Sequence, residues 1–285
     1  MNLDAIKTVA VLGAGTMGNG IAHVFARSGF AVILRDIEQR FLDRALETIS
    51  KNLDREIKKG KLAVAQKPAV LARVQPVTDM SAIARADFAV EAVPERLDLK
   101  LEVLRAADEL LRPDVILASN TSSISITTLA AATSRPDLFL GMHFMNPVPV
   151  MLLVEVIRAL QTSDATFSTT MALCEKLERK PVAVNDAPGF VSNRVLMPLI
   201  NEAAYCVMEG VATAEGVDEV MKLGMNHPMG PLALADLIGI DTCLNIMEVL
   251  YAGFADSKYR PCPLLRKMVA AGHLGRKSGR GFFAY

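Results

Sequence analysis

The chain has 285 residues, of which 51% are hydrophobic, and its 31 Lys and Arg residues balance its 31 Asp and Glu residues. This length allows two domains, each with its own core. A net charge of zero gives no basic field to attract nucleic acid or a membrane surface, and no uninterrupted apolar segment reaches the length that a bilayer requires. We therefore expect neither nucleic acid nor a membrane as a partner.

The cysteines and histidines are too scattered to indicate a metal site or a disulfide framework. The four cysteines lie mostly in apolar helical stretches, and the four histidines lack metal-ligand spacing. We expect reduced thiols, no bound metal and a cytoplasmic location. The first residues include an acid and lead directly into a strand, which is not typical of a secretory signal.

The first predicted elements are a strand, a glycine-rich turn, a helix and a second strand that ends at an acid. They are the strand 7–12, the turn Gly13-Ala-Gly-Thr-Met-Gly18, the helix 19–28, and the strand 31–34 before Asp36. Such a turn lets backbone N–H groups approach a pyrophosphate at the start of the helix. We predict dinucleotide binding by Gly13, Gly15, Thr16, Met17 and Gly18. Asp36 at the ribose favours NAD over NADP, although the neighbouring Arg35 can tolerate a 2′-phosphate.

The middle of the chain continues this alternation. We expect a helix over 37–62, a connection and strand over 71–80, strands over 87–93 and 114–118, and helices over 97–111 and 124–132. The first of these helices ends in a basic stretch, which is either a solvated face or a landing site for a polyanionic substrate. Glu95 and the run Ser119-Asn-Thr-Ser-Ser123 follow strand ends, where open parallel sheets bind ligands. Ser122 and Ser123 suit helix capping equally well.

Two apolar runs joined by a turn rich in proline contain the candidate catalytic pair. The first run ends at His143 and the second begins at Met151, and the turn between them contains Asn146, Pro147 and Pro149. A hairpin centred on Pro149 would place His143 opposite Glu155 as cross-strand neighbours. A carboxylate that holds one imidazole nitrogen fixes the tautomer, so the other nitrogen can accept and return a proton. A purely structural His–Glu pair is the alternative.

The last third of the chain is almost entirely helical. After a helix over 163–177 and a strand over 180–184, we expect helices over 191–208, 213–223, 231–251 and 263–271. The sequence thus predicts the α/β class, with a Rossmann-type, mostly parallel sheet domain over 1–184 and an all-α domain over 185–285. Apolar stripes in the helical domain predict a homodimer. Asn193, early in the long helix, either points toward an interdomain cleft or is a surface or capping residue.

Several motifs together resemble the 3-hydroxyacyl-CoA dehydrogenase family, most closely its bacterial 3-hydroxybutyryl-CoA branch. They run the length of the chain: Gly13 to Gly18, Ser119 to Ser123, His143-Phe-Met-Asn-Pro-Val-Pro-Val150, Leu153 to Val156, Pro188-Gly-Phe-Val-Ser-Asn-Arg194, His227 to Pro231, and Gly275 to Phe282. The resemblance implies that His143 is the catalytic base and Glu155 its orienting partner. It implies that Ser122 and Asn193 contact the substrate oxygen and the nicotinamide region. It further implies NAD contacts from Glu95, Lys100, Asn146 and Lys277, and CoA contacts from Asn52 and Lys59.

The resemblance implies an NAD-dependent oxidoreductase that interconverts 3-hydroxybutyryl-CoA and acetoacetyl-CoA, in fatty-acid metabolism such as β-oxidation or in butanoate-type metabolism. Two other functions are alternatives. A β-hydroxyacid dehydrogenase would carry a catalytic Lys on the long helix, which here begins Val191-Ser-Asn-Arg-Val195 and offers none. A non-catalytic protein that binds NAD or acyl-CoA would have no need of the full set Ser122, His143, Glu155 and Asn193.

Overall fold

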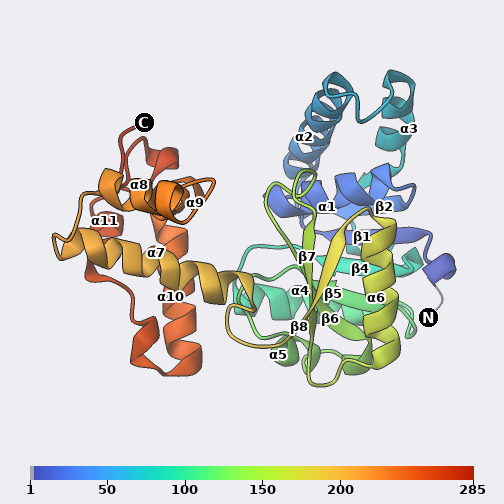
Figure 1. Cartoon of the computed structure of the whole chain (residues 1–285). Coiled ribbons are helices and arrows are strands. Elements are labelled where there is room, and N and C mark those ends of the chain that lie inside the picture. Colours follow the sequence, from blue (N-terminus) through green and yellow to red (C-terminus); the bar gives the residue numbers. More distant parts are fainter. Residues whose placement is uncertain (1–2) are drawn as a thin grey trace. The chain divides into compact units, whose positions relative to one another are not determined.

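The computed structural model describes residues 3–285, which form two compact units (Figure 1). Unit 1 ends at Asp186, and unit 2 runs from Ala187 to Tyr285. None of the helices formed by residues 3–285 combines the length and apolarity that crossing a membrane requires.

Unit 1 contains one sheet of eight strands in the order β3-β2-β1-β4-β5-β6-β7-β8. Neighbouring strands are parallel except for β6 and β7, which pair antiparallel. Because β1 lies between β2 and β4, the chain changes direction across the sheet there, and such a switch point is where open parallel sheets bind ligands. The strands are β1 Thr8–Leu12, β2 Ala31–Arg35, β3 Val74–Val77, β4 Phe88–Glu91, β5 Ile116–Ser119, β6 Phe139–Phe144, β7 Leu153–Arg158 and β8 Lys180–Asn185.

Helices cover both faces of this sheet, which explains why the central strands are apolar at nearly every position. The α-helices of unit 1 are α1 Thr16–Arg27, α2 Gln39–Lys58, α3 Lys67–Ala72, α4 Leu97–Leu110, α5 Ile126–Ala130 and α6 Asp164–Lys176; 3-10 turns span Leu3–Ala5, Val64–Gln66, Met80–Arg85 and Pro136–Leu138. Ile21 and Phe25 of α1 are completely buried in a core that also includes Val9, Val11 and Leu173 of α6. Each such side chain contributes roughly 1.5–3 kcal/mol through burial.

Two predicted helices of unit 1 are longer in the sequence analysis than in the structure. The helix expected over 37–62 ends at Lys58, and residues 64–72 form a 3-10 turn and the short helix α3, which starts at Lys67 and has Pro68 in its first turn. The helix expected over 124–132 spans only Ile126–Ala130. Its N-cap is Ser125, whose side chain accepts a hydrogen bond from the backbone N–H of Thr128.

The regular elements of unit 2 are all helices within the part of the chain that the structure describes, and the tail adds isolated bridges from Arg280 to Gly275 and Ala284. It contains α7 Ser192–Met208, α8 Ala214–Gly224, α9 Pro231–Ile238, α10 Ile240–Phe254 and α11 Pro263–Ala270, with 3-10 turns over Ser257–Tyr259 and Arg276–Ser278. The expectation of one helix over 231–251 is wrong. Gly239 adopts φ +106°, which helical backbone does not allow, and divides the segment into α9 and α10. The helical spacing of apolar residues continues across this glycine, so the sequence pattern does not indicate that the helix is interrupted there.

The glycine-rich C-terminal tail folds back onto α9. The buried carboxylate of Asp236 accepts hydrogen bonds of 2.9 Å from the backbone N–H groups of Phe282 and Phe283, and one of 3.1 Å from the hydroxyl of Tyr285. A Cβ at Gly281 would lie 1.9 Å from an Asp236 oxygen, so only glycine fits there. One carboxylate therefore fixes the tail to the helical unit.

Candidate active site

The glycine-rich turn after β1 leaves the start of α1 open. Gly13 has φ +104°, and a Cβ there would lie 2.7 Å from the carbonyl oxygen of Ala92 beyond β4. A Cβ at Gly18 would lie 1.7 Å from the oxygen of Gly13, whereas a Cβ at Gly15 would meet nothing within 4 Å. Two glycines thus allow the turn to close, and the third leaves space beside the helix N-terminus. This arrangement fits a dinucleotide pyrophosphate.

Asp36, the acid after β2, lies beside this turn. One carboxylate oxygen accepts a 2.6 Å hydrogen bond from the backbone N–H of Ala14, and the other accepts one of 2.7 Å from that of Ile37. A carboxylate oxygen has a further lone pair for a ribose hydroxyl. The position agrees with the expected ribose contact, which stays a prediction.

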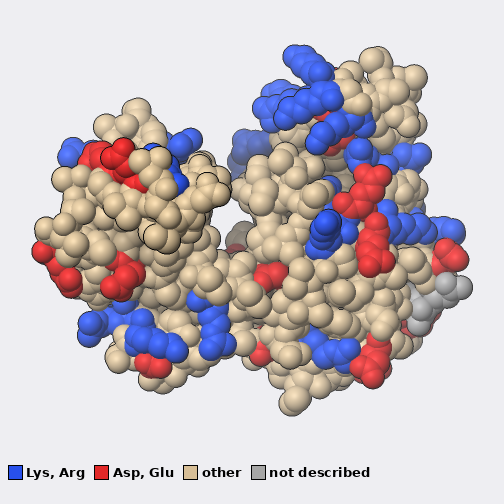
Figure 2. Space-filling view, in the orientation of Figure 1, with Lys and Arg blue, Asp and Glu red and all other residues tan. Residues whose placement is uncertain are grey.

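A cavity of about 490 Å³ joins the glycine-rich turn to α2 and to the turn before β7. Its lining includes Gly15, Thr16, Asn52 and Asn146, four predicted contact residues from three distant segments. Arg44 and Arg55 also line it, and Arg44 was not among the predicted site residues. Lys59, the predicted CoA contact, is the exposed C-cap of α2 and does not line this cavity. Figure 2 shows Lys and Arg side chains gathered over the end of unit 1 that α2 forms.

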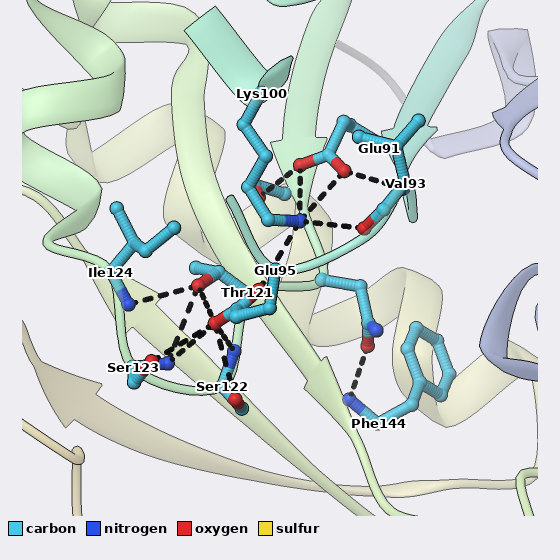
Figure 3. Close-up of polar contacts among 11 residues, drawn as sticks. Glu91, Val93, Glu95, Lys100, Thr121, Ser122, Ser123, Ile124 and Phe144 are labelled. Atoms are coloured by element: carbon cyan, nitrogen blue, oxygen red, sulfur yellow. Dashed lines mark hydrogen bonds and ion pairs between the residues drawn. The ribbon is translucent and has the colours of Figure 1, made fainter. Parts of the chain in front are cut away.

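The Ser/Thr run after β5 is gathered by one carboxylate oxygen (Figure 3). Glu95 Oε1 accepts hydrogen bonds from the Thr121 hydroxyl at 2.6 Å, from the Ser122 and Ser123 backbone N–H groups at 2.8 and 3.0 Å, and from their hydroxyls at 3.1 Å. Helix capping does not explain Ser122 and Ser123, because Ser125 caps α5. Glu95 and Ser122, both predicted site residues, are therefore neighbours.

Lys100, another predicted cofactor contact, is completely buried in α4. Its Nζ lies 2.8 and 3.0 Å from the two carboxylate oxygens of Glu91, 3.2 Å from the carbonyl oxygen of Val93, and 3.4 Å from Glu95 Oε2. A direct contact between Lys100 and NAD stays a prediction. Glu91 was not predicted as a site residue, although it is a lone carboxylate inside the apolar run Phe-Ala-Val-Glu-Ala-Val, the same signal that indicates Glu155.

Burial shifts the pKa values of the two glutamates in this cluster. Burial raises the pKa of Glu91 above its ordinary value, against the opposing effects of Lys100 and Ser119. For Glu95, burial also raises the pKa, but the Lys100 ammonium and the hydrogen bonds from the Ser/Thr run together outweigh it and leave the pKa below its ordinary value. Glu95 is therefore a stable anion at neutral pH.

The predicted His–Glu pair forms in the predicted register. β6 and β7 place His143 directly opposite Glu155, and the distance from His143 Nδ1 to Glu155 Oε2 is 2.7 Å. The residues are 8% and 2% exposed, so the contact is almost free of water. With Glu155 ionised, Nδ1 donates the hydrogen bond and Nε2 carries the lone pair that can accept a proton.

A side-chain amide links this pair to the Ser/Thr run. The Asn120 Oδ1 atom accepts a 2.9 Å hydrogen bond from the backbone N–H of Phe144, the residue after His143 (Figure 3). Asn120 is buried and precedes Thr121 directly. In the sequence Asn120 is only one member of a polar run, because its partner is 24 residues away.

Two predicted site residues lie in unit 2. Asn193 is buried in the first turn of α7, where its backbone N–H donates to the carbonyl oxygen of Gly189. Lys277 lies in the C-terminal tail, and its Nζ is 2.7 Å from a carboxylate oxygen of Asp241. Their contacts with the substrate and with NAD stay predictions. Across residues 3–285, no group of His, Cys, Asp and Glu side chains is arranged to hold a metal ion.

Comparisons with known proteins agree over nearly the whole chain. Residues 8–187 match the model of the 3-hydroxyacyl-CoA dehydrogenase NAD binding domain, and residues 189–285 match the model of the C-terminal domain of the same family. A probable 3-hydroxybutyryl-CoA dehydrogenase from Bacillus subtilis is 56% identical over 280 residues, which is 98% of each chain. A 3-hydroxybutyryl-CoA dehydrogenase from Bradyrhizobium diazoefficiens is 50% identical over 98% of this chain and 96% of its own.

A solved structure agrees equally well. The crystal structure of (S)-3-hydroxybutyryl-CoA dehydrogenase from Ralstonia eutropha has a TM-score of 0.96 and 54% identity to this chain, covering 98% of this chain and 99% of its own. The fold, the NAD binding domain and the sequence motifs therefore lead to one conclusion. The chain belongs to the 3-hydroxyacyl-CoA dehydrogenase family.

Proposed function

We propose that this chain is an NAD-dependent dehydrogenase that interconverts (S)-3-hydroxybutyryl-CoA and acetoacetyl-CoA. The observation that carries the proposal is the buried His143–Glu155 pair, which joins β6 to β7, and β6 lies next to β5, the strand that the Ser/Thr run follows. In an open sheet with a switch point between β1 and β4, the second half of a dinucleotide lies beyond the carboxyl ends of the strands on the β4 side, where β5 and β6 also lie. The names of the relatives above support the four-carbon acyl chain and the S configuration.

The chain's own residues perform the proton chemistry. Bound NAD⁺ supplies the acceptor for the hydride that leaves C3 of the hydroxyacyl group. His143 takes the proton of the 3-hydroxyl group at Nε2 and returns it in the reverse reaction. Glu155 holds Nδ1 and stabilises the imidazolium that forms, because their hydrogen bond then becomes an ion pair in a site nearly free of water. We assign Ser122 and Asn193 to the C3 oxygen or the thioester carbonyl, which they keep aligned.

Cations along α2 support a substrate that carries CoA. The CoA moiety has a diphosphate and a 3′-phosphate, which require positive partners. Arg44 and Arg55 line the cavity beside the glycine-rich turn, and Lys59 closes the same helix as its exposed C-cap. We assign the CoA nucleotide to this region, with Asn52 as a polar contact.

Two finer assignments complete the proposal. The first is a homodimer formed through unit 2, which is supported by large apolar side chains that are more than half exposed, including Val195 of α7 and Val220 and Leu223 of α8. Replacing Leu223 by Asp should then reduce the apparent mass in light scattering to that of one chain. The second is a cytoplasmic location, supported by four cysteines that are all free thiols.

Turnover of acetoacetyl-CoA with NADH separates the proposal from its rivals. The proposed enzyme consumes NADH when acetoacetyl-CoA is added and does not do so with free short hydroxy or keto acids. A β-hydroxyacid dehydrogenase shows the opposite preference and needs a Lys, which α7 lacks. A non-catalytic paralogue binds NADH, as seen in its fluorescence, but consumes none. Either of the last two results would overturn the proposal.

A further inference from the structure

Glu91 and Lys100 form a buried ion pair at the carboxyl end of β4, between the ends of β1 and β5. The side chains of Lys100 and Glu91 are 1% and 0% exposed, and two hydrogen bonds join them. Removing two charges from water is costly, and well-packed apolar residues are often at least as stabilising. Stability alone is therefore a weak reason for such a pair.

Glu91 is fixed to the sheet by contacts other than Lys100. It is the last residue of β4, where it is paired with Leu12 of β1 and Ser119 of β5. The Ser119 hydroxyl donates a 2.6 Å hydrogen bond to Oε2, and the Val93 N–H donates one of the same length to Oε1. Glu91 thus holds the Lys100 ammonium at the switch point between β1 and β4.

Lys100 reaches from this anchor to Glu95, the residue that binds the Ser/Thr run (Figure 3). Its Nζ lies 3.4 Å from Glu95 Oε2, and Glu95 Oε1 accepts the hydrogen bonds of Thr121, Ser122 and Ser123. A continuous polar path therefore leads from the sheet through Glu91, Lys100 and Glu95 to Ser122. Networks in which every member is satisfied are rigid and specify one arrangement.

We propose that Glu91 and Lys100 are positioning residues for the dehydrogenase reaction, which hold Glu95 in place and through it fix the Ser122 hydroxyl. The inference rests on the proposed function, because that function gives Ser122 its contact with the substrate oxygen. This positioning role requires no contact with the substrate or NAD, and the predicted contact between Lys100 and NAD is separate from it. Their effect on turnover passes through the run of residues 121–123.

The first test measures the run itself and needs no turnover. Hydrogen–deuterium exchange followed by mass spectrometry reports on peptides that contain the Ser122 and Ser123 amides, both of which donate to Glu95. In Glu91→Gln these amides should exchange about tenfold faster, as local opening becomes easier. Asp108→Asn is the matched control, because Asp108 lies on the same helix as Lys100 and forms a largely buried ion pair with Arg135. Equal exchange at residues 121–124 in Glu91→Gln and wild type, or equal acceleration in the control, overturns the proposal.

The second test is a double-mutant cycle on kcat at saturating substrates. Glu91→Gln should lower kcat about tenfold in the wild-type background and less than about twofold in the Ser122→Ala background, because residues that act in series are not additive. Asp108→Asn should leave kcat unchanged in both backgrounds. An equal fold loss in the two backgrounds, or no loss in the folded Glu91→Gln enzyme, overturns the positioning role.

A milder variant keeps the test decisive if Glu91→Gln does not fold. Ser119→Ala removes only the hydroxyl that holds Glu91 Oε2. It should lower kcat about threefold in the wild-type background and leave kcat unchanged in the Ser122→Ala background, following the same series logic. Wild-type turnover of acetoacetyl-CoA judges the proposed function separately, so a failed cycle in an active enzyme overturns the positioning role alone.

Discussion

Replacing Glu155 by Gln tests whether the buried carboxylate serves catalysis or only packing. The substitution keeps the size of the side chain but removes the charge that lies 2.7 Å from His143 Nδ1. The imidazolium formed in the reaction then loses a charge-assisted hydrogen bond in a site where Glu155 is only 2% exposed. Such bonds contribute about 1.5–3 kcal/mol, which corresponds to a loss in kcat of roughly 10- to 150-fold.

A second effect has the same direction. The Gln amide can donate to Nδ1 as well as accept from it, so part of the population would carry its proton on Nε2 and lose the base. We therefore expect kcat to fall about 100-fold in steady-state reduction of acetoacetyl-CoA, with a nearly unchanged KM. A loss confined to kcat is typical of an interaction made in the transition state.

The chain offers a matched control for this variant. His23 and Glu56 form a second His–Glu pair in unit 1, with 3.0 Å between His23 Nε2 and Glu56 Oε1. This pair joins α1 to α2, and His23 is completely buried. Glu56→Gln should lower Tm without changing kcat. The reasoning is refuted if Glu155→Gln keeps more than half of the wild-type kcat, or if Glu56→Gln loses as much.

Three further predictions concern the cofactor, the substrate and the acid limit of stability. Asp36→Ser should lower kcat/KM for NAD and raise kcat/KM for NADP, because Arg35 can then contact the 2′-phosphate. An unchanged ratio of the two kcat/KM values would mean that Asp36 does not contact the ribose. Lys59→Ala should raise KM for acetoacetyl-CoA a few-fold at low salt, since an exposed ion pair contributes roughly 0.5–1 kcal/mol, and an equal penalty with a pantetheine substrate that lacks the nucleotide would rule out a phosphate contact. Burial raises the pKa of Glu56, but His23 and Arg27 outweigh this effect and hold the pKa below its ordinary 4.5. The His23–Glu56 pair therefore stabilises the fold at pH values above 4.5, and this stabilisation is lost as the pH falls through the lower pKa of the folded state. Tm should therefore fall less on acidification in Glu56→Gln than in wild type, and parallel Tm curves would contradict this.

The sequence predicts those parts of the site that depend on local spacing. The register of His143 and Glu155 follows from the hairpin itself, because two antiparallel strands around a turn centred on Pro149 pair position 143 with position 155. The glycine-rich turn and Asp36 follow from the strand–turn–helix–strand order. Both patterns are complete within about thirty residues of chain, a span typical of such a unit.

Contacts between distant segments could not be predicted in the same way. The sequence indicates that Lys100 lies in a helix, but it does not indicate that the side chain is buried against Glu91. That burial arises only when α4 packs on the sheet. Arg44 lines the cavity only because the fold places α2 beside the glycine-rich turn. The break at Gly239 depends on a backbone angle that apolar periodicity does not encode.

The most direct test of the account is the His143→Ala variant, assayed for kcat with acetoacetyl-CoA and for NADH affinity by fluorescence titration. Loss of a general base typically costs about 10²- to 10⁴-fold in rate. Because His143 lies in β6 and does not line the cavity beside the glycine-rich turn, NADH affinity should change little. A large fall in kcat with retained NADH binding is the predicted result. A variant that keeps more than half of the wild-type kcat would exclude His143 as the base and contradict the mechanism.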